Sequence, residues 1–329
     1  MKIIHCADIH LDSRMSANLT REKARERRTE LLATFRKMVE YGAAHEVNAI
    51  LIAGDLFDTK NVSATARNVV KDLILGHPGI EFYYLQGNHD EGSFTWGLSQ
   101  IPENLHLFDS KWTSFPLGKK VCITGVELNP ENSGSVYNTL SLDADQVNIV
   151  VLHGQESEYS AKDKAEVIHL TALKNKGIDY LALGHIHGYK KERLDGRGVY
   201  CYPGCLEGRG FDECGEHGFV ELSVDEAAGT VESRFVPFAS RNLYTIPVDI
   251  TGCVSTMEIL ERMKEETDAG NYPEKSLVKY ELTGKVDVES EKETDFLLHQ
   301  FSSRFYFVKI KDSSKYLVDY ASFAKDVSL

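Results

Sequence analysis

The sequence predicts an α/β fold in which helices accompany buried strands. Seven short apolar segments, rich in β-branched and aliphatic residues and bounded by Gly, Asn or Pro, are typical of strands buried on both faces. Longer segments between some of them repeat their apolar residues at helical spacing. Because strands and helices alternate, we expect a layered α/β domain. The predicted strands are residues 2–6, 49–53, 81–85, 121–124, 147–152, 180–183 and 199–202.

Three helices are expected among these strands. The first covers about residues 20–45, and the second covers about residues 63–75, where Gly76-His77-Pro78-Gly79 ends it. A third helix is predicted over residues 165–176, ending at Gly177. Their positions between the strands support the layered arrangement.

The pattern changes around residues 237–242, and the chain beyond them has no cluster of metal-ligand type. We therefore expect two domains, residues 1–238 and residues 239–329, of which the second is a small α+β domain. Its expected elements, in order, are a strand at 243–250, a helix at 255–267, a strand at 277–282, a helix at 291–301 and a strand at 304–310.

The composition is that of a globular protein without a membrane segment. Hydrophobic residues make up 42% and charged residues 26% of the chain of 329 residues. Neither a long apolar run nor a signal-peptide pattern is present, so we expect a cytoplasmic protein. The net charge of −13 argues against a protein that coats nucleic acid by bulk electrostatics. It does not exclude a nuclease, because metal ions and a local basic patch can attract DNA.

The six cysteines form no Cys-x-x-Cys pair and lack zinc-ribbon spacing. We expect reduced and mostly buried thiols. The alternative interpretation is a metal site formed by Cys201, Cys205, Cys214 and His217.

Five short clusters of Asp, His and Asn each follow the end of a predicted strand. Taken alone, Asp8-x-His10 and Gly87-Asn88-His89-Asp90 are typical of a cap or a turn, and Gly184-His185-x-His187 is compatible with two surface histidines. Together they share a position and a ligand chemistry, and ligands in α/β folds gather at the carboxyl ends of strands. We therefore interpret them as one pocket for two divalent metal ions. The clusters are Asp8-Ile9-His10, Gly54-Asp55, Gly87-Asn88-His89-Asp90, His153-Gly154 and Gly184-His185-Ile186-His187.

A pair of metal ions about 3.5–4 Å apart suits the hydrolysis of a phosphodiester bond. The ions neutralise the phosphate oxygens and lower the pKa of a bound water to about 7, which makes hydroxide available. One carboxylate must bridge the ions, and Asp55 is the candidate because it directly follows a buried strand and Gly54. The other candidate ligands are Asp8, His10, Asn88, His153, His185 and His187.

This series of clusters resembles the calcineurin-like metallophosphoesterase superfamily. Within it, Gly54-Asp55-Leu56-Phe57-Asp58 and Tyr202-Pro203-Gly204 resemble the DNA double-strand-break repair nucleases of the SbcD type, the nuclease subunits of SbcCD-like complexes. The opening residues 5–13 are similar to the YhaO-type bacterial branch, and residues 307–312 resemble the capping domain of these nucleases. The resemblance implies an α-β-β-α sandwich followed by a small α+β capping domain.

The resemblance also implies a role for each candidate residue. His89 would face the scissile phosphate and either steady the transition state or protonate the leaving oxygen. Asp90 would orient His89. The metal would be manganese, although mixed oxygen and imidazole ligands also accept iron or zinc. One metal would be held by Asp8, His10, Asp55 and His187, and the other by Asp55, Asn88, His153 and His185.

Basic residues that follow the last cluster are candidates for binding the substrate phosphate. They are Lys190, Lys191 and Arg193. The resemblance further implies DNA as the substrate, a homodimer, and a coiled-coil ATPase of the SbcC type as the partner. In the family, the segment that binds this ATPase follows the capping domain. This chain ends at Leu329, so we expect that segment to be absent.

We therefore expect a two-metal-dependent phosphodiesterase, specifically a DNA exonuclease or endonuclease of DNA repair that uses a metal-bridging hydroxide. The alternative is a metallophosphoesterase that acts on a small molecule, such as a cyclic nucleotide or a nucleotide, or on a phosphoprotein. The acidic charge favours this alternative, and the second domain weighs against it. A non-catalytic scaffold is the third interpretation, and the presence of every ligand position and of His89 argues against it.

Overall fold

The computed structural model describes residues 1–15, 19–58, 62–89, 100–157 and 167–317. The chain divides into two compact units. Unit 1 consists of residues 1–209 and 216–240, and unit 2 consists of residues 210–215 and 241–329. A single cut in the chain therefore does not separate the units, because a short segment inside the sequence of unit 1 belongs to unit 2.

Unit 1 contains two six-stranded sheets. The first has, in spatial order, β14 (Thr230–Pro237), β13 (Gly218–Asp225), β1 (Lys2–Cys6), β2 (Ala49–Ala53), β3 (Glu81–Leu85) and β4 (Leu105–Leu107). The second has β11 (Lys190–Arg193), β12 (Val199–Tyr202), β10 (Tyr180–Gly184), β7 (Val147–His153), β6 (Val121–Gly125) and β5 (Thr113–Leu117). Strands β1 to β4 are parallel, as are β6, β7, β10 and β12. All the predicted strands of this unit are present.

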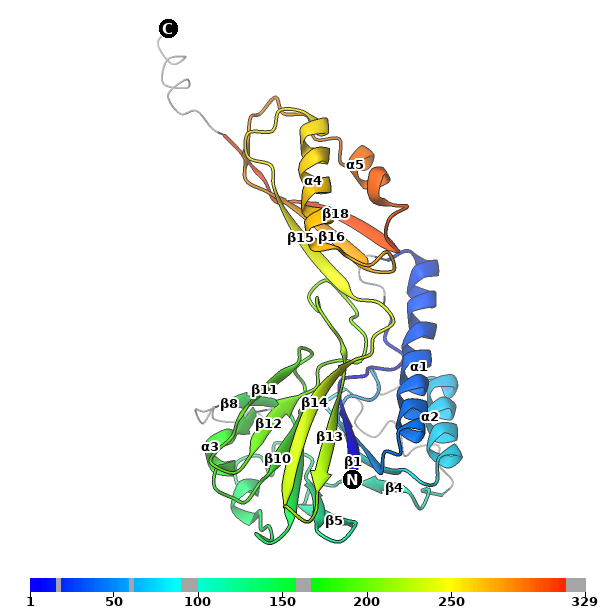
Figure 1. Cartoon of the computed structure of the whole chain (residues 1–329), viewed down its shortest axis with the longest axis vertical. Coiled ribbons are helices and arrows are strands. Elements are labelled where there is room, and N and C mark those ends of the chain that lie inside the picture. Colours follow the sequence, from blue (N-terminus) through cyan, green and yellow to red (C-terminus); the bar gives the residue numbers. More distant parts are fainter. Residues whose placement is uncertain (16–18, 59–61, 90–99, 158–166, 318–329) are drawn as a thin grey trace. The chain divides into compact units, whose positions relative to one another are not determined.

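Two long helices cover one face of the first sheet (Figure 1). Helix α1 (Arg21–Ala44) begins after Thr20, whose side chain accepts a hydrogen bond from the Lys23 amide. Helix α2 (Ala64–Gly76) begins after Ser63, which caps it in the same way. Both predicted helices are confirmed.

The helix predicted over residues 165–176 is wrong. Residues 165–166 lie outside the described part of the chain, and Val167–His169 form strand β9, which pairs with β8 (Gln155–Ser157). Only α3 (Leu170–Leu173) is helical. The β-branched pair at 167–168 fits a strand better than a helix, and a left-handed residue, Asn175, follows the single turn.

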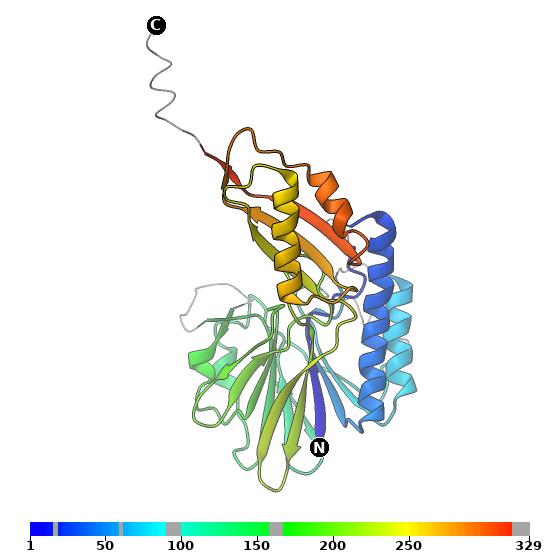
Figure 2. The same cartoon turned by 45° about the horizontal axis from the view of Figure 1, so that its top comes forward.

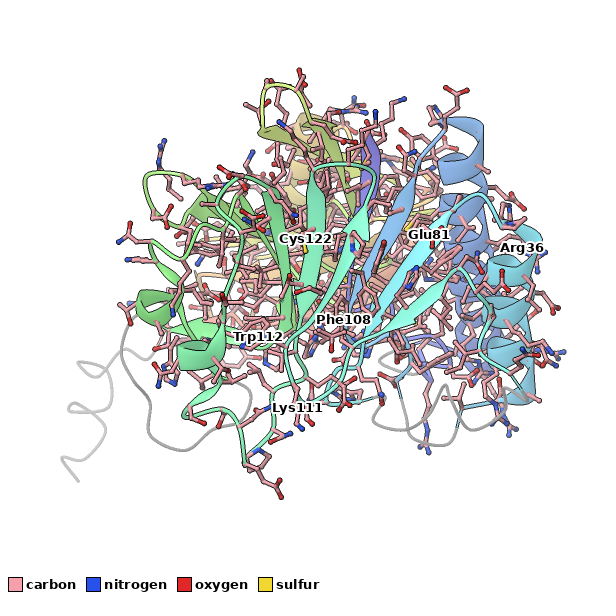
Figure 3. The ribbon with its side chains drawn as sticks, turned by 90° about the horizontal axis from the view of Figure 1, so that it is seen from below. Arg36, Glu81, Phe108, Lys111, Trp112 and Cys122 are labelled. Atoms are coloured by element: carbon pink, nitrogen blue, oxygen red, sulfur yellow. The ribbon has the colours of Figure 1, made fainter. Side chains whose placement is uncertain are left out.

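The central strands of unit 1 bury both of their faces. In β1, Ile4 packs with α1 and α2, whereas Ile3 packs with the second sheet. Phe108 lies beyond β4 with its ring centroid 5.6 Å from that of Phe115 on β5 (Figure 3). The outer face of the second sheet packs against α3 and the short 3-10 helix Val136–Thr139. These layers confirm the predicted α-β-β-α architecture.

Unit 2 is a three-stranded parallel sheet with helices on one face, and Figure 2 shows α4 lying across that sheet. Its elements are β15 (Leu243–Asp249), α4 (Thr256–Gly270), β16 (Leu277–Thr283), β17 (Lys285–Val286), α5 (Thr294–Phe301), β18 (Phe307–Asp312) and β19 (Lys315–Tyr316). The segment 210–215 joins it, because the Gly215 amide donates to the Leu243 carbonyl at 3.0 Å. Among the described residues of the whole chain, no helix has the length and apolar character that a bilayer span requires.

Candidate metal centre

The polar clusters follow strands that end at one edge of each sheet. The loops after β1 and β2 continue side by side: the Asp8 amide donates to the Gly54 carbonyl at 3.1 Å, and the His10 amide donates to the Asp55 carbonyl at 2.9 Å. These two backbone hydrogen bonds continue the pairing beyond the strands and fix the backbone of Asp8 and Asp55. They place Asp8 and Asp55 next to each other, as the parallel order of β1 and β2 requires.

Three hydrogen bonds connect the strand ends of the second sheet to those of the first. The His185 amide donates to both carboxylate oxygens of Asp8, each at 3.0 Å. The His153 Nδ1 atom lies 2.9 Å from the carbonyl oxygen of Ala53, the last residue of β2. The predicted convergence of the clusters therefore exists in the structure, and backbone groups of each sheet hold side chains of the other.

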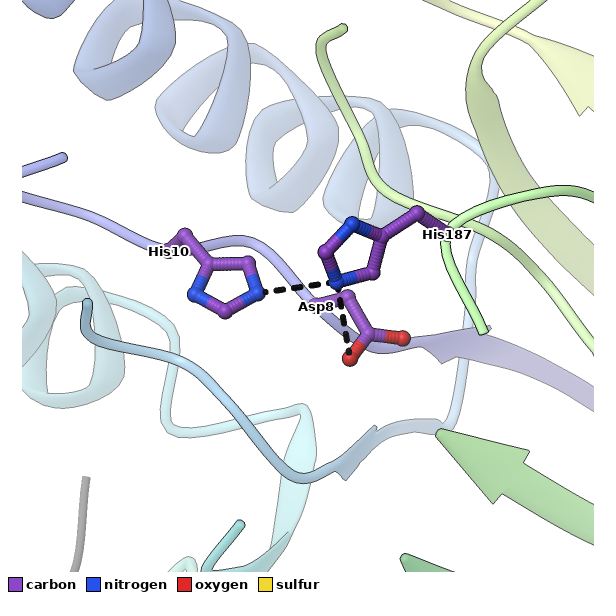
Figure 4. Close-up of side chains that lie close together, drawn as sticks. All are labelled: Asp8, His10 and His187. Carbon is purple, nitrogen blue, oxygen red and sulfur yellow. Dashed lines mark hydrogen bonds and ion pairs between the residues drawn. The ribbon is translucent and has the colours of Figure 1, made fainter. Parts of the chain in front are cut away.

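One group of side chains forms around the end of β1. The Nε2 atoms of His10 and His187 are 3.2 Å apart, and the His187 Nε2 atom is 4.0 Å from Asp8 Oδ1 (Figure 4). Asp8 and His10 are fully buried, whereas the side chain of His187 is 28% exposed. Two imidazole nitrogens and a carboxylate oxygen thus point to the same place, which is the arrangement that a divalent ion needs.

A second group forms around Asp55. The His153 Nε2 atom lies 3.1 Å from Asn88 Oδ1 and 3.5 Å from Asp55 Oδ2. The rings of His153 and His185 have centroids 5.4 Å apart. The Asp55 carboxylate also lies 3.8 Å from His10 Nε2, which belongs to the first group. Asp55 therefore lies within 4 Å of a histidine of each group, and Asp8 is also near both, since its carboxylate lies within 4.8 Å of ligand atoms of Asp55 and His153.

Electrostatics hold Asp55 ionised. Burial opposes its charge, but the hydrogen bond and charge of His153 outweigh burial and keep the pKa of Asp55 well below its usual range. Burial likewise disfavours the charged form of His153, yet Asp55 prevails and raises the pKa of His153 to about 9. For His10, burial prevails and lowers the pKa of the imidazole. Without a metal, Asp55 and His153 thus form a buried ion pair.

Glycine makes room for these side chains. A Cβ atom on Gly54, where φ is +89°, would lie 2.1 Å from His153 Nδ1. A Cβ atom on Gly87 would lie 2.1 Å from Asp55 Oδ1. The backbone of the site is also strained, since left-handed φ angles are uncommon outside glycine and cost about 1–3 kcal/mol each. Such angles occur at Asp8 (51°), His10 (50°), Asp55 (50°) and His185 (106°).

The remaining predicted site residues have distinct surroundings. The His89 amide donates to Asp55 Oδ1 at 3.0 Å, and its exposed ring has its centroid 5.1 Å from that of His10. Asp90 lies outside the described residues.

The three basic residues proposed to bind substrate lie on β11, and each makes a contact of its own. Lys190 Nζ is 2.5 Å from Glu156 Oε1, which raises the pKa of this lysine. Lys191 Nζ is 3.4 Å from the Ser233 carbonyl, and Arg193 donates to the Asp195 carbonyl at 3.2 Å. Their role in binding substrate stays a prediction.

Sequence reasoning assigned no role to two further residues that contact the site. Asp58 Oδ1 lies 3.1 Å from His10 Nδ1, a place typical of the carboxylate that orients a ligating histidine. Arg209 donates to Asp58 Oδ1 at 3.0 Å, and its second nitrogen is 3.1 Å from His187 Nδ1. The position of Asp58, four residues after Gly54, is the only signal that could have found either residue.

The alternative cysteine site is not formed. Cys205 Sγ lies 3.3 Å from His217 Nδ1, and both residues are buried. Cys214 is exposed and contacts Thr245 instead. Among the described residues, the groups of three or more ligand-type side chains contain no cysteine.

The chain belongs to the calcineurin-like phosphoesterase family, whose family model matches residues 1–189. This range contains all five clusters. Members of the family use a centre of two metal ions, and the side chains described above fit such a centre because they form two mixed oxygen and nitrogen groups joined by Asp55.

Two relatives show where the chain lies within the family. The metallophosphoesterase YhaO of Bacillus subtilis is 31% identical over 281 residues, which cover 81% of this chain and 67% of that protein. The DNA double-strand break repair protein Mre11 of Methanopyrus kandleri is 28% identical over 279 residues, which cover 75% of this chain and 59% of that protein. The chain thus spans less than two thirds of the Mre11 protein. Among solved structures, a dimetal phosphatase from Danio rerio is similar at 12% identity and a TM-score of 0.45, over 68% of this chain and 92% of that one.

Proposed function

We propose that this chain is a two-metal-dependent phosphodiesterase that cleaves DNA, with manganese as its metal. The observation that supports this most is the sharing of Asp55 between two groups of ligand-type side chains. The Mre11 relatives, which are named for the repair of DNA double-strand breaks, favour DNA over other phosphodiesters. Whether cleavage begins at an end or within a strand is part of the test below.

The proposed ligand sets are those that the resemblance to the family implies. When bound, the two ions neutralise phosphate oxygens and make a nucleophile available at neutral pH. The chain's own contribution is to keep the ligands in place, since the Ala53 carbonyl and Asp58 orient His153 and His10. One ion is assigned to Asp8, His10, Asp55 and His187, and the other to Asp55, Asn88, His153 and His185.

His89 is proposed as the residue that acts on the phosphate. Its backbone is fixed by the hydrogen bond to Asp55, while its ring remains exposed beside His10. An exposed imidazole next to a buried ligand set can donate a hydrogen bond or a proton to the leaving oxygen. The orienting role of Asp90 is a proposal that rests on the resemblance alone.

The partners inferred from the resemblance remain predictions. They are a coiled-coil ATPase of the SbcC type and a second copy of this chain. Because the chain spans only 59% of the Mre11 protein of Methanopyrus kandleri, the assembly of the whole protein is proposed and not shown. The cytoplasmic location is likewise a prediction.

The experiment is a cleavage assay with the purified chain, Mn²⁺, and linear or closed circular duplex DNA. Cleavage of linear DNA alone would identify an exonuclease, and cleavage of both would identify an endonuclease. Asp8→Ala and His89→Ala should each abolish cleavage, whereas His299→Ala, which removes an exposed imidazole from α5, should not. The proposal fails if DNA stays intact while the chain loaded with Mn²⁺ hydrolyses other phosphate esters.

A second candidate is a phosphoesterase that acts on a small molecule or a phosphoprotein. The net charge of −13 favours it, because a strongly acidic protein repels a polyanion. Relative rates on bis-p-nitrophenyl phosphate and p-nitrophenyl phosphate separate a diesterase from a monoesterase. A preference for the monoester would favour this second candidate.

A further inference from the structure

A ring of four side chains connects Arg209 to the candidate ligands around β1. Arg209 Nη1 lies 3.0 Å from Asp58 Oδ1, which is 3.1 Å from His10 Nδ1. The other nitrogen of His10, Nε2, is 3.2 Å from His187 Nε2. The ring closes at His187 Nδ1, which is 3.1 Å from Arg209 Nη2. Every member is partly or fully buried, so the contacts are protected from competition by water.

The chemistry of a guanidinium group fixes one hydrogen-bond role in this ring. Arginine has only donors, so the His187 Nδ1 atom must accept the hydrogen bond from Arg209. A neutral imidazole that accepts at Nδ1 carries its hydrogen on Nε2. That Nε2 atom faces His10 and Asp8, and an atom that carries hydrogen there cannot bind a metal ion.

His153 in the other ligand group has the opposite arrangement. Its Nδ1 atom faces the Ala53 carbonyl, which only accepts, so Nδ1 carries hydrogen and Nε2, once it has lost its proton, is the atom that can bind a metal. At His153, the hydrogen bond to the Ala53 carbonyl is therefore compatible with a metal bound at Nε2. At His187, the hydrogen bond from Arg209 to Nδ1 excludes a metal bound at Nε2.

We propose that Arg209 is a positioning residue that competes with the metal for His187, so that its guanidinium weakens the binding of the ion held by His10 and His187. This proposal rests on the proposed two-metal function. Loading the site of His10 and His187 requires the guanidinium to leave His187 Nδ1, while its other nitrogen can stay on Asp58.

The backbone before Arg209 is anchored, which makes this a movement of the side chain. Glu207 is buried, and its carboxylate accepts hydrogen bonds from Arg27 at 3.0 Å and from Thr34 at 2.6 Å, both on α1. The Gly208 carbonyl accepts a further bond from Arg27 at 3.0 Å. The segment is thus fixed two residues before the guanidinium that contacts His187.

The test is a calorimetric titration of the metal-free chain with Mn²⁺. The wild type should bind two ions, and Arg209→Met should bind one of them about tenfold more tightly, because the competing charged hydrogen bond is gone. Arg209→Lys, which keeps the charge but loses the fork of two donors, should show a smaller gain. Arg234→Met removes an exposed guanidinium that pairs with Glu221 and should change neither affinity. Wild-type or weaker Mn²⁺ binding by Arg209→Met would overturn the proposal.

A second measurement needs no variant of Arg209. Long-range ¹H–¹⁵N spectra of the imidazoles, assigned with His187→Gln, report which ring nitrogen carries hydrogen. In the metal-free chain, His187 should carry its hydrogen on Nε2. In the chain loaded with Zn²⁺, which replaces the paramagnetic Mn²⁺ for this measurement, His187 should carry its hydrogen on Nδ1. Hydrogen on Nδ1 in the metal-free chain would contradict the competition. A chain that binds no metal at all would instead refute the proposed function, while the spectrum of the metal-free chain would still decide the role of Arg209.

Discussion

The Nδ1 atom of His153 lies 2.9 Å from the carbonyl oxygen of Ala53. Ala53 ends β2 in the first sheet, and His153 ends β7 in the second. The contact therefore orients a side chain of one sheet on the backbone of the other, next to the residue that both ligand groups share. The spacing of the two sheets at this point therefore determines where His153 lies relative to Asp55.

The stability of the metal-free chain should fall as the pH rises from about 6.5 to 9. The pair with Asp55 raises the pKa of His153 from 6.5 to about 9 in the folded state. A histidine whose pKa is higher in the folded state stabilises the protein fully at pH values below its unfolded pKa. This stabilisation is lost as the pH rises through its folded pKa. Urea denaturation in EDTA at several pH values measures it, with His153→Gln as the control that lacks the decline. An equal decline in His153→Gln would assign the effect to another group.

Affinity for Mn²⁺ should show the opposite dependence on pH. His153 must lose its Nε2 proton before it can bind a metal, so apparent affinity should rise with pH, by up to about tenfold per unit below the pKa. Titrations in buffers of different ionisation enthalpy would also detect the released proton. Constant affinity between pH 6 and pH 8 would show that His153 is not a ligand.

Gly54→Ala should abolish Mn²⁺ binding at the Asn88/His153 group. The added methyl group would lie 2.1 Å from His153 Nδ1 and would require a left-handed φ of +89° of an alanine. Both effects push His153 away from the Ala53 carbonyl. Gly188→Ala is the matched control, because it directly follows His187 but a Cβ atom there meets nothing within 4 Å. Calorimetric titration that finds both ions bound to Gly54→Ala would contradict this account of the site.

Glu207→Gln should destabilise unit 1 by about 3–5 kcal/mol, because it leaves the buried Arg27 guanidinium without its buried counter-charge. Glu30→Gln is the control, since Glu30 also pairs with Arg27, at 2.7 Å, but its side chain is 19% exposed. The control should lose much less free energy of unfolding. Equal losses by the two variants in chemical denaturation would show that burial does not set the strength of this pair.

The parts of the fold that position the site could be predicted from the sequence, because β1, β2, β3, β7 and β10 are mostly apolar segments that end at a candidate ligand or within three residues of one. The antiparallel strands β13 and β14 were not predicted, although their alternation of more and less buried residues is the pattern of a half-exposed strand. The single turn α3 replaced a predicted helix because β-branched residues precede it.

The candidate ligands were identified because short motifs hold them together in the sequence. Arg209 was missed because its contact with His187 joins residues 22 positions apart, through a loop whose path only the fold determines. The same holds for the buried pair of Arg27 and Glu207, which lie 180 positions apart.

The most direct test of the central claim is a crystal structure of the chain with Mn²⁺, read by anomalous scattering at the manganese edge. The account predicts two anomalous peaks on either side of the Asp55 carboxylate. One should lie against Asp8, His10 and His187, and the other against Asn88, His153 and His185. A single peak that does not contact Asp55, or no peak at a saturating Mn²⁺ concentration, would contradict it.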